Sequence, residues 1–303
     1  HHPLQVLKHY WGYDGFRPGQ AEVIDSILSG HDTLALMPTG GGKSITFQVP
    51  ALANSGICLV ISPLVALMKD QVKNLQKRGI LSAFISSEMP HWEILQQLDN
   101  CILGDYKFLY ISPERISSEL FQEKLKTLSR KVNLLVVDEA HCISQWGNDF
   151  RRDYRLIADI RDAIPHVQVI AVTASATAAV VADICEQLHF RKGYRIFKTS
   201  FERKNLSFVV RKTDNKLKEI CHILSAVPGS AVIYSRTRKG VEEYAGKLRA
   251  AGISAEYFHA GLDPVLKTER QTNWVKGFTR VLVATNAFGM GIDKGDVRVV
   301  IHT

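Results

Sequence analysis

The sequence lacks the features by which several classes of protein are recognised. It contains no apolar run of about 18 residues or more and no secretory signal, so we expect no membrane span and no export, and hence a cytoplasmic protein. Its 5 cysteines are widely spaced and form no C-x-x-C pair. A disulfide framework and a zinc site are therefore not expected, and a reducing compartment is favoured.

The composition is that of a globular protein with an excess of basic residues. Lys and Arg number 38 against 30 Asp and Glu, which gives a formal net charge of +8. This bias favours polyanionic partners, although charge alone does not establish nucleic-acid binding. A length of 303 residues, 46% of them hydrophobic, suggests two domains that each have a core.

Short apolar runs of strand length recur along the first part of the chain, with helical patterns between them. The runs lack polar alternation, which is typical of strands covered on both faces of a parallel sheet. This alternation of strand and helix predicts a doubly wound α/β fold whose binding crevice lies at the carboxyl ends of the strands. The predicted strands are residues 33–37, 57–62, 108–112, 134–138 and 169–173.

The α/β pattern restarts after a polar and charged stretch around residues 200–216. Strand-like runs follow at 230–235, 253–259, 281–285 and 297–302, and residues 238–251 form a helical pattern. We therefore expect a first domain over residues 1–204 and a second over 205–303. Because the chain ends directly after a strand-like run, the second domain is expected to be incomplete.

A glycine-rich loop follows the first predicted strand and reads MPTGGGKS over residues 37–44. Its glycines allow backbone N–H groups to turn towards phosphate oxygens, and the helix that follows presents its positive end to the same site. Lys43 is suited to the β- and γ-phosphates and the Ser44 hydroxyl to Mg²⁺. Met37 stands where the strict pattern has Gly, so a plain flexible loop is the alternative. The predicted nucleotide-binding residues here are Thr39, Gly40, Gly41, Gly42, Lys43 and Ser44.

An acidic pair, Asp138 and Glu139, closes the predicted strand at 134–138 and so emerges at the same edge of the sheet. Asp138 is suited to hold Mg²⁺, and Glu139 to orient or deprotonate an attacking water. An isolated acidic pair is usually only solvated. Together with the glycine loop, however, the pair predicts hydrolysis of a nucleoside triphosphate.

Ordered motifs along essentially the whole chain resemble those of RecQ-type DNA helicases of superfamily 2. The run CISQWGNDFR within residues 138–151 is the most specific of them, since other superfamily members share the phosphate and D-E-A-H motifs. The remaining motifs are FRPGQ (16–20), ISPLVALMKDQV (61–72), ISPER (111–115), AVTASAT (171–177), SAVIYSRTRKGVEEYA, YFHAGL and VLVATNAFGMGIDKGDVRVVIH.

The resemblance implies two RecA-like domains, a bound ATP with Mg²⁺, and single-stranded and duplex DNA as partners. It implies unwinding in the 3′ to 5′ direction by a monomer that acts in DNA repair and recombination, at the nucleoid if the source is a bacterium. The family's arginine-finger motif would lie beyond Thr303, so slow ATP turnover is expected of these 303 residues alone.

The resemblance also implies roles for individual residues. Tyr13, Arg17 and Gln20 would contact adenine, with the Gln20 amide suited to its N6/N7 edge. His141 would join the catalytic group Lys43, Asp138 and Glu139, and Asp293 is a weaker candidate for the nucleotide. Contacts to the strand are expected from Ser62, Lys69, Ser112, Arg115, His259, Thr285 and Asn286.

Residues 142–151 would form an aromatic-rich loop that senses DNA through Trp146, Phe150 and Arg151. Stacking of bases on aromatic rings accepts any sequence. We hypothesise that strand binding orders the loop and aligns Glu139 and His141, whereas simple packing of the two rings is the alternative. Asn148 and Arg152 depart from the family's His and Pro.

Two other functions remain compatible with the sequence. An RNA helicase shares the ATP machinery, and no motif reads a 2′-hydroxyl from sequence alone. A nucleotide-gated binding module without productive hydrolysis is the second. A GTPase is not favoured because no N-K-x-D motif follows the glycine loop.

Overall fold

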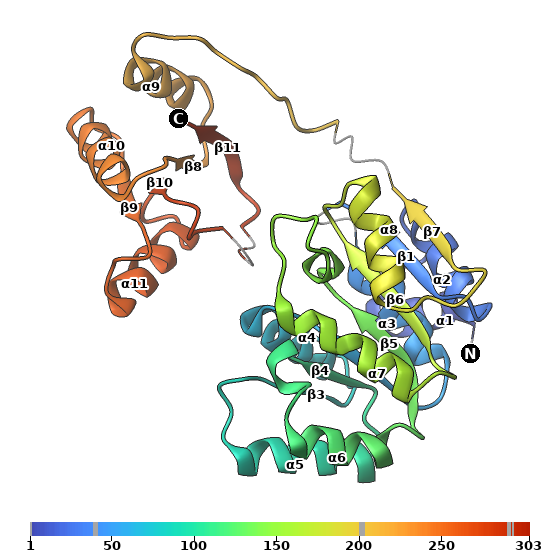
Figure 1. Cartoon of the computed structure of the whole chain (residues 1–303). Coiled ribbons are helices and arrows are strands. Elements are labelled where there is room, and N and C mark those ends of the chain that lie inside the picture. Colours follow the sequence, from blue (N-terminus) through green and yellow to red (C-terminus); the bar gives the residue numbers. More distant parts are fainter. Residues whose placement is uncertain (1, 39–41, 200–203, 290–291, 293) are drawn as a thin grey trace. The chain divides into compact units, whose positions relative to one another are not determined.

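The computed structural model describes residues 2–38, 42–199, 204–289, 292 and 294–303. The chain folds into two compact units, His1–Arg203 and Lys204–Thr303 (Figure 1). Each unit is built on its own parallel β-sheet, so the predicted α/β class with two parallel sheets is confirmed. Among the residues described, no helix is both long and apolar enough to cross a membrane.

The first unit contains a seven-stranded sheet in the order β3-β4-β2-β5-β6-β1-β7, in which every pairing is parallel. The apolar runs of the sequence form its buried central strands. The strands are β1 (Thr33–Leu36), β2 (Ile57–Ile61), β3 (Ser82–Ile85), β4 (Phe108–Ile111), β5 (Val132–Val137), β6 (Gln168–Thr173) and β7 (Arg195–Lys198).

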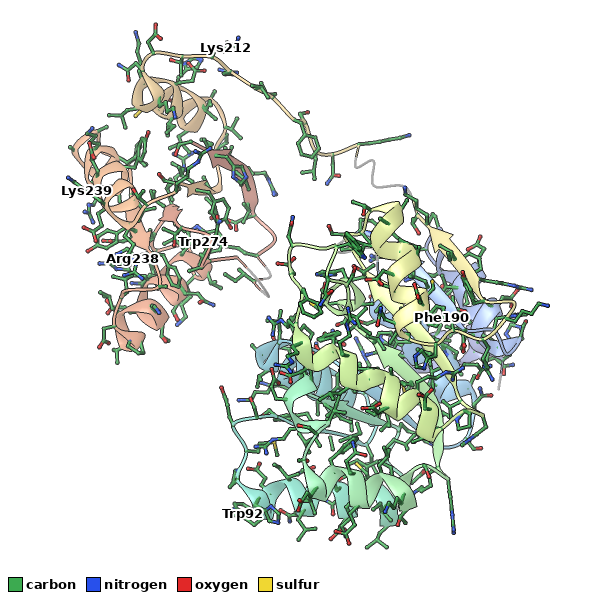
Figure 2. The ribbon with its side chains drawn as sticks, in the orientation of Figure 1. Trp92, Phe190, Lys212, Arg238, Lys239 and Trp274 are labelled. Carbon is green, nitrogen blue, oxygen red and sulfur yellow. The ribbon has the colours of Figure 1, made fainter. Side chains whose placement is uncertain are left out.

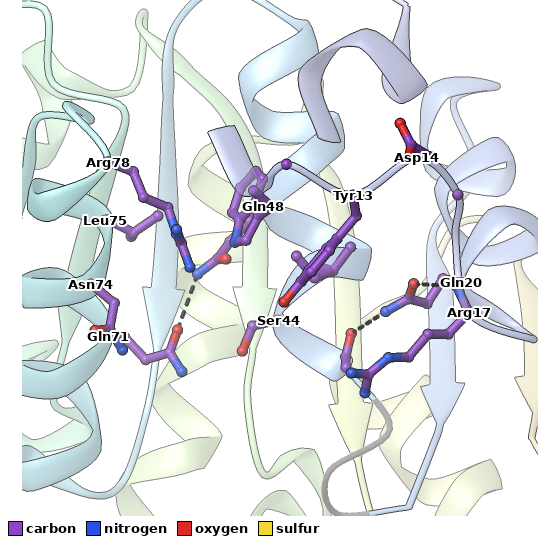
Figure 3. A pocket seen from close by; sticks show the side chains of 15 residues that line it. Tyr13, Asp14, Arg17, Gln20, Ser44, Gln48, Gln71, Asn74, Leu75 and Arg78 are labelled. Carbon is purple, nitrogen blue, oxygen red and sulfur yellow. Dashed lines mark hydrogen bonds between the residues drawn. The ribbon is translucent and has the colours of Figure 1, made fainter. Parts of the chain in front are cut away.

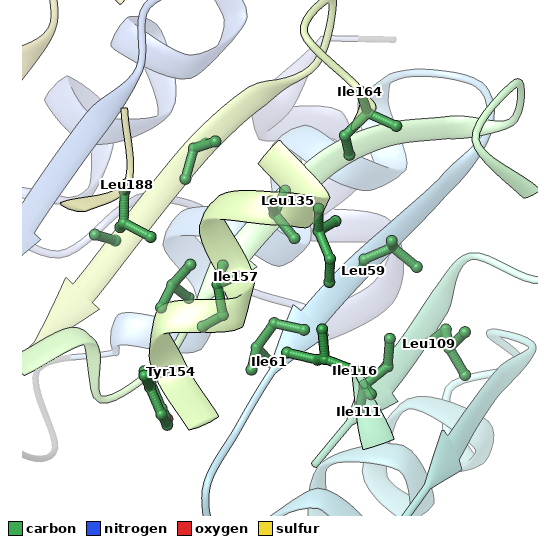
Figure 4. Close-up of a cluster of buried hydrophobic side chains, with 14 of the residues drawn as sticks. Leu59, Ile61, Leu109, Ile111, Ile116, Leu135, Tyr154, Ile157, Ile164 and Leu188 are labelled. Carbon is green, nitrogen blue, oxygen red and sulfur yellow. The ribbon is translucent and has the colours of Figure 1, made fainter. Parts of the chain in front are cut away.

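Helices cover both faces of this sheet and create two apolar cores. Successive residues of β2 point to opposite faces, with Leu59 in one core and Val60 in the other. One core packs against α1 (Pro3–Trp11), α2 (Gln20–Leu28), α3 (Lys43–Ala53) and α4 (Val65–Lys77). The other, shown in Figure 4, packs against α5 (His91–Leu103), α6 (Glu119–Leu128), α7 (Ile157–Ala163) and α8 (Ala178–Gln187).

A buried ion cluster joins the segments at the amino ends of β1, β6 and β7. Asp32, only 1% exposed, pairs with Arg161 at 2.8 Å and with Arg191 at 3.2 Å. Its carboxylate also accepts hydrogen bonds from the backbone N–H of Val169 and of Arg191. The carboxylate is therefore surrounded by donors at the edge of the sheet opposite to the glycine loop.

The second unit contains a four-stranded parallel sheet in the order β11-β8-β10-β9. Its cores are small, and Trp274, labelled in Figure 2, is a large buried side chain in one of them. The elements are α9 (Lys216–Ala226), β8 (Ser230–Tyr234), α10 (Arg238–Ala250), β9 (Ala255–Phe258), α11 (Pro264–Val275), β10 (Val281–Ala284) and β11 (Val297–His302).

Candidate functional site

The carboxyl ends of β1, β6 and β5 lie side by side in the first sheet, and each carries a polar group of the site. Gly42 caps the start of α3, the helix that follows β1, Thr173 ends β6, and the acidic pair directly follows β5. Thr39, Gly40 and Gly41 lie outside the described residues, as does Asp293. The parallel order of the strands is what brings together groups about a hundred residues apart in sequence.

Lys43 and Glu139 converge at this edge, with Lys43 Nζ 3.6 Å from Glu139 Oε1. Glu139 Oε2 lies 3.5 Å from His141 Nδ1, and the same ring nitrogen lies 2.7 Å from Thr173 Oγ1. The predicted lysine, glutamate and histidine are thus neighbours in one cluster that spans three strand ends.

Glu139 has a backbone conformation that is rare for a side-chain-bearing residue. Its φ of 48° lies in the left-handed region, where only one other described non-glycine residue, His189, is found. Such strain concentrates at functional sites, where the surrounding structure holds it in place. Here the turn directs the carboxylate towards Lys43 and leads into the short helix η2 (Ala140–Ile143).

Asp138 is held from several sides. Its backbone N–H donates to the carbonyl of Ile61, its Oδ1 accepts from the Glu139 N–H at 2.9 Å, and its carbonyl accepts from the Tyr154 hydroxyl. Burial raises the pKa of the Asp138 carboxyl from 3.8 to about 6; nearby Lys43 opposes this shift and Glu139 adds to it. The ionised carboxylate is therefore destabilised even with Lys43 nearby.

Asp138→Asn is expected to raise the free energy of unfolding by about 1–3 kcal/mol at pH 7.5 without nucleotide or Mg²⁺. Because the pKa is higher in the folded state, the folded protein binds the proton more tightly than the unfolded chain does. The stabilisation of the folded state by the Asp138 carboxyl is fully present below pH 3.8 and is lost as the pH rises through about 6. Urea unfolding at pH 7.5 and at pH 3.8 or below should show the gain only at the higher pH. Equal gains at both pH values, or a similar gain in the exposed-residue control Asp70→Asn, would contradict this account.

A cavity of about 640 Å³ adjoins the start of α3. Tyr13, Arg17 and Gln20 line one part of it, as Figure 3 shows, together with Gly42 and Ser44. The Gln20 amide accepts from the backbone N–H of Arg17 at 2.8 Å and donates to the Gly42 carbonyl at 3.0 Å. A Cβ at Gly42 would collide with this amide, so glycine is required for the contact as well as for its φ of 77°.

Another part of the same cavity was not predicted from the sequence. It is lined by Trp11 from α1, Gln48 from α3 and residues of α4 with the turn that follows it. Gln48 is buried and donates to Gln71 Oε1 and to the Tyr110 hydroxyl, both at 3.1 Å. Polar residues inside an amphipathic helix gave no indication that they would line this cavity. The remaining lining residues on this side are Asn74, Leu75 and Arg78.

The aromatic-rich loop has a fixed stem and an exposed tip. Ser144 Oγ donates to Asp183 Oδ2 on α8 at 2.6 Å and accepts from the Trp146 N–H at 3.2 Å. The Arg151 N–H donates to the Cys142 carbonyl at 2.8 Å, which closes the loop. Trp146 is 78% exposed, so it does not pack beneath the loop. Asp183 was missed because no sequence motif links it to the loop.

The residues predicted to contact a strand in the first unit occupy different environments. Ser62 and Ser112 are buried at the ends of β2 and β4, whereas Lys69 on α4 is exposed. The Arg115 guanidinium donates to three carbonyls, those of Ser86, Ser87 and Met89, at 2.8–3.0 Å. Arg115 therefore anchors the turn after β3 in this structure.

In the second unit, the residues predicted to contact a nucleic-acid strand lie after β9 and β10. His259 is buried; its Nε2 lies 3.0 Å from Glu242 Oε1 and its Nδ1 accepts from the Gly261 N–H. Thr285 directly follows β10 and donates its backbone N–H to the Phe258 carbonyl, whereas Asn286 is exposed. Both ring nitrogens of His259 thus have partners within the unit.

Residues 17–184, which contain the lysine and the acidic pair just described, match the family model described as DEAD/DEAH box helicase. The chain belongs to the DEAD/DEAH box helicase family. Residues 215–303 match the model described as Helicase conserved C-terminal domain.

Curated relatives place the chain more closely within this family. It is 42% identical over 305 aligned residues to the ATP-dependent DNA helicase RecQ of Bacillus subtilis and 39% identical over 300 to that of Pasteurella multocida. The predicted resemblance to RecQ-type helicases is therefore confirmed. These matches cover 100% and 99% of this chain but 51% and 47% of the relatives, so the chain spans about half of their length.

The fold is also shared with solved helicase structures. The Mycobacterium smegmatis helicase Lhr bound to ssDNA and AMP-PNP superposes with a TM-score of 0.68. The match covers 100% of this chain and 44% of that chain at 18% identity. At this identity the comparison shows the fold, which is the two-sheet architecture of RecA-like helicase cores.

Proposed function

We propose that this chain is the ATP-driven motor of a RecQ-type DNA helicase, which moves 3′ to 5′ along single-stranded DNA and unwinds duplexes in repair and recombination. The observation that carries the proposal is the 3.6 Å approach of Lys43 to Glu139, at the point where the aromatic-rich loop leaves the sheet. The residues that bind phosphate would thus lie next to the start of the loop that senses the DNA strand. A cytoplasmic or nucleoid location and a monomeric state are part of the same proposal.

The nucleotide-binding residues have complementary tasks in this proposal. The N-terminus of α3 and the Lys43 ammonium would bind the triphosphate, because both present positive charge to it. Tyr13, Arg17 and Gln20 line the adjoining cavity and would hold the adenine. The Glu139 carboxylate would orient the attacking water and accept its proton, with His141 fixed between it and Thr173.

Ser44 and Asp138 fit the requirements of a Mg²⁺ ion. A hydroxyl and a carboxylate are the hard oxygen ligands that Mg²⁺ takes beside substrate phosphates and water. Asp138 is buried next to the acidic Glu139, and nearby Lys43 offsets only part of the resulting destabilisation, so a further cation would stabilise its ionised form. Mg²⁺ held there would supply neutralisation of the charge that develops on the phosphate oxygens. The described residues hold no cluster of three or more His, Cys, Asp or Glu side chains suited to a metal ion.

The decisive experiment is ATP hydrolysis by the 303-residue chain and by a longer chain, each with and without single-stranded DNA and RNA. Stimulation by DNA exceeding that by RNA is expected. Greater stimulation by RNA would favour an RNA helicase. Nucleotide binding without hydrolysis in both chains would favour a nucleotide-gated binding module.

Trp146→Ala is expected to reduce the DNA stimulation of ATP hydrolysis about tenfold, because the loss of one stacking contact removes roughly 1–3 kcal/mol of strand binding. Binding of a fluorescent ATP analogue should stay unchanged, since Trp146 is 78% exposed and does not line the cavity around Gln20. Trp92→Ala is the matched control, because Trp92 is 67% exposed at the start of α5, which follows the edge strand β3, and β4 and β2 lie between that strand and β5. Unchanged stimulation in the Trp146 variant would contradict strand sensing by this loop.

A further inference from the structure

A second cavity, of about 390 Å³, lies beside the aromatic-rich loop and has no role in the function described so far. Of its lining residues, only Phe150 was assigned to strand sensing. Leu156 and Phe150 supply apolar surface, and the rest of the lining is polar or charged. The lining residues are Gln145, Phe150, Arg152, Asp153, Arg155 and Leu156, which come from the loop and from the short helix η3 (Arg152–Leu156).

Arg155 carries a hydrogen-bond donor that the protein leaves unused. Its guanidinium carbon lies 5.5 Å from the centre of the Phe150 ring, so the cation rests on the aromatic face. Among the residues described, its Nε is buried and has no hydrogen-bond partner. Buried donors are nearly always paired, and an unpaired one marks a place where an acceptor is missing. The donor lies on a side chain that lines the cavity.

The charges around the cavity select the kind of acceptor. Arg152 and Arg155 contribute two guanidinium groups, and Asp153 contributes one carboxylate, so the lining has a net positive charge. Guanidinium groups bind phosphate oxygens through paired N–H donors better than lysine does. Gln145 is exposed and adds an amide donor. A phosphate, which only accepts hydrogen bonds near neutral pH, fits this set of donors.

We propose that this cavity binds one backbone phosphate of the nucleic-acid strand, held by Arg152 and Arg155. The proposal rests on the proposed function, because the strand must already pass the exposed Trp146. Arg155 has two tasks in it: its guanidinium positions the Phe150 ring, and its unpaired Nε–H donates to the phosphate. Arg152, which is exposed, adds charge from the opposite end of η3.

The test is the salt dependence of binding to single-stranded thymidine oligonucleotides. For single strands the slope of log affinity against log salt is about −0.7 for each phosphate neutralised. The double variant Arg152→Gln, Arg155→Gln should therefore bind about tenfold more weakly and show a slope smaller in magnitude by about 0.7. ATP hydrolysis without DNA should be unchanged. Arg130→Gln removes a cation near the opposite edge of the sheet and should alter neither quantity.

Two further measurements distinguish a phosphate site from a structural role of the arginines and from recognition of bases. Arg152→Gln alone changes an exposed side chain, so its smaller slope would not reflect unfolding. The difference in salt-dependence slope between the wild type and the double variant should persist on an abasic strand, because that strand keeps its phosphates. An unchanged slope with weaker binding, or loss of the difference on the abasic strand, overturns the proposal. Wild type that fails to bind any strand would instead refute the proposed function.

Discussion

Glu139→Gln is expected to lower the rate of ATP hydrolysis by about 10²- to 10⁴-fold, which is the usual contribution of a positioned general base. Glutamine keeps the shape of the side chain and can still hydrogen-bond to Lys43 and His141, but it cannot accept a proton from water. ATP affinity should therefore change little. Phosphate release measured in a single turnover gives the rate even where steady-state turnover is slow, and titration with a fluorescent ATP analogue gives the affinity.

Two further variants serve as comparisons for Glu139→Gln. Lys43→Ala should weaken ATP binding itself, because it removes the ammonium group that we propose binds the triphosphate. Glu114→Gln changes an exposed acid on the short helix η1 (Pro113–Arg115) and should leave both rate and affinity unchanged. A Glu139→Gln rate within about tenfold of wild type would mean that another group accepts the proton, and the assignment of Glu139 would be wrong.

The carboxyl edge of the first sheet was predictable because local patterns fixed it. The apolar runs that became β1, β2, β4, β5 and β6 are continuous and end in turn or functional residues, so their parallel arrangement placed Lys43 and Asp138 at one edge. The edge strands β3 and β7 were not predicted. Most of β7 is exposed and carries Arg195 and Lys198, so it lacks the apolar run of a covered strand.

Contacts between distant segments were harder to predict than the strands. The link from Ser144 to Asp183 joins residues 39 positions apart, and neither belongs to a motif that implies the other. The lining of the cavity beside Gln20 by Gln48 and Gln71 depends on the packing of α3 beside α4, which periodicity does not specify. On the basis of its motif, Arg115 was predicted to contact a nucleic-acid strand, whereas its guanidinium binds three carbonyls in the structure. Its role in strand binding stays a prediction.

A mutation at the opposite edge of the same sheet should separate stability from activity. Asp32→Asn is expected to lower the free energy of unfolding of the first unit by about 3–5 kcal/mol, because removal of one partner leaves a buried charge uncompensated. Arg161, only 3% exposed, would lose its carboxylate partner at 2.8 Å. For a unit of this size the melting temperature should fall by roughly 6–20 °C, as about 2–4 °C is lost per kcal/mol.

Asp99→Asn is the matched control for this prediction. Asp99 pairs with Lys124 at the same distance of 2.8 Å, but their side chains are 43% and 28% exposed. A surface pair of this kind contributes only about 0–1 kcal/mol, so the melting temperature should change by a few degrees at most. Because Asp32 precedes β1 and the glycine loop follows it, the folded Asp32→Asn protein should hydrolyse ATP at the wild-type rate at low temperature. Equal destabilisation by the two variants would show that burial does not determine how much the Asp32 cluster contributes to stability. A lower rate of ATP hydrolysis by the folded Asp32→Asn protein would show that the cluster affects the candidate active site.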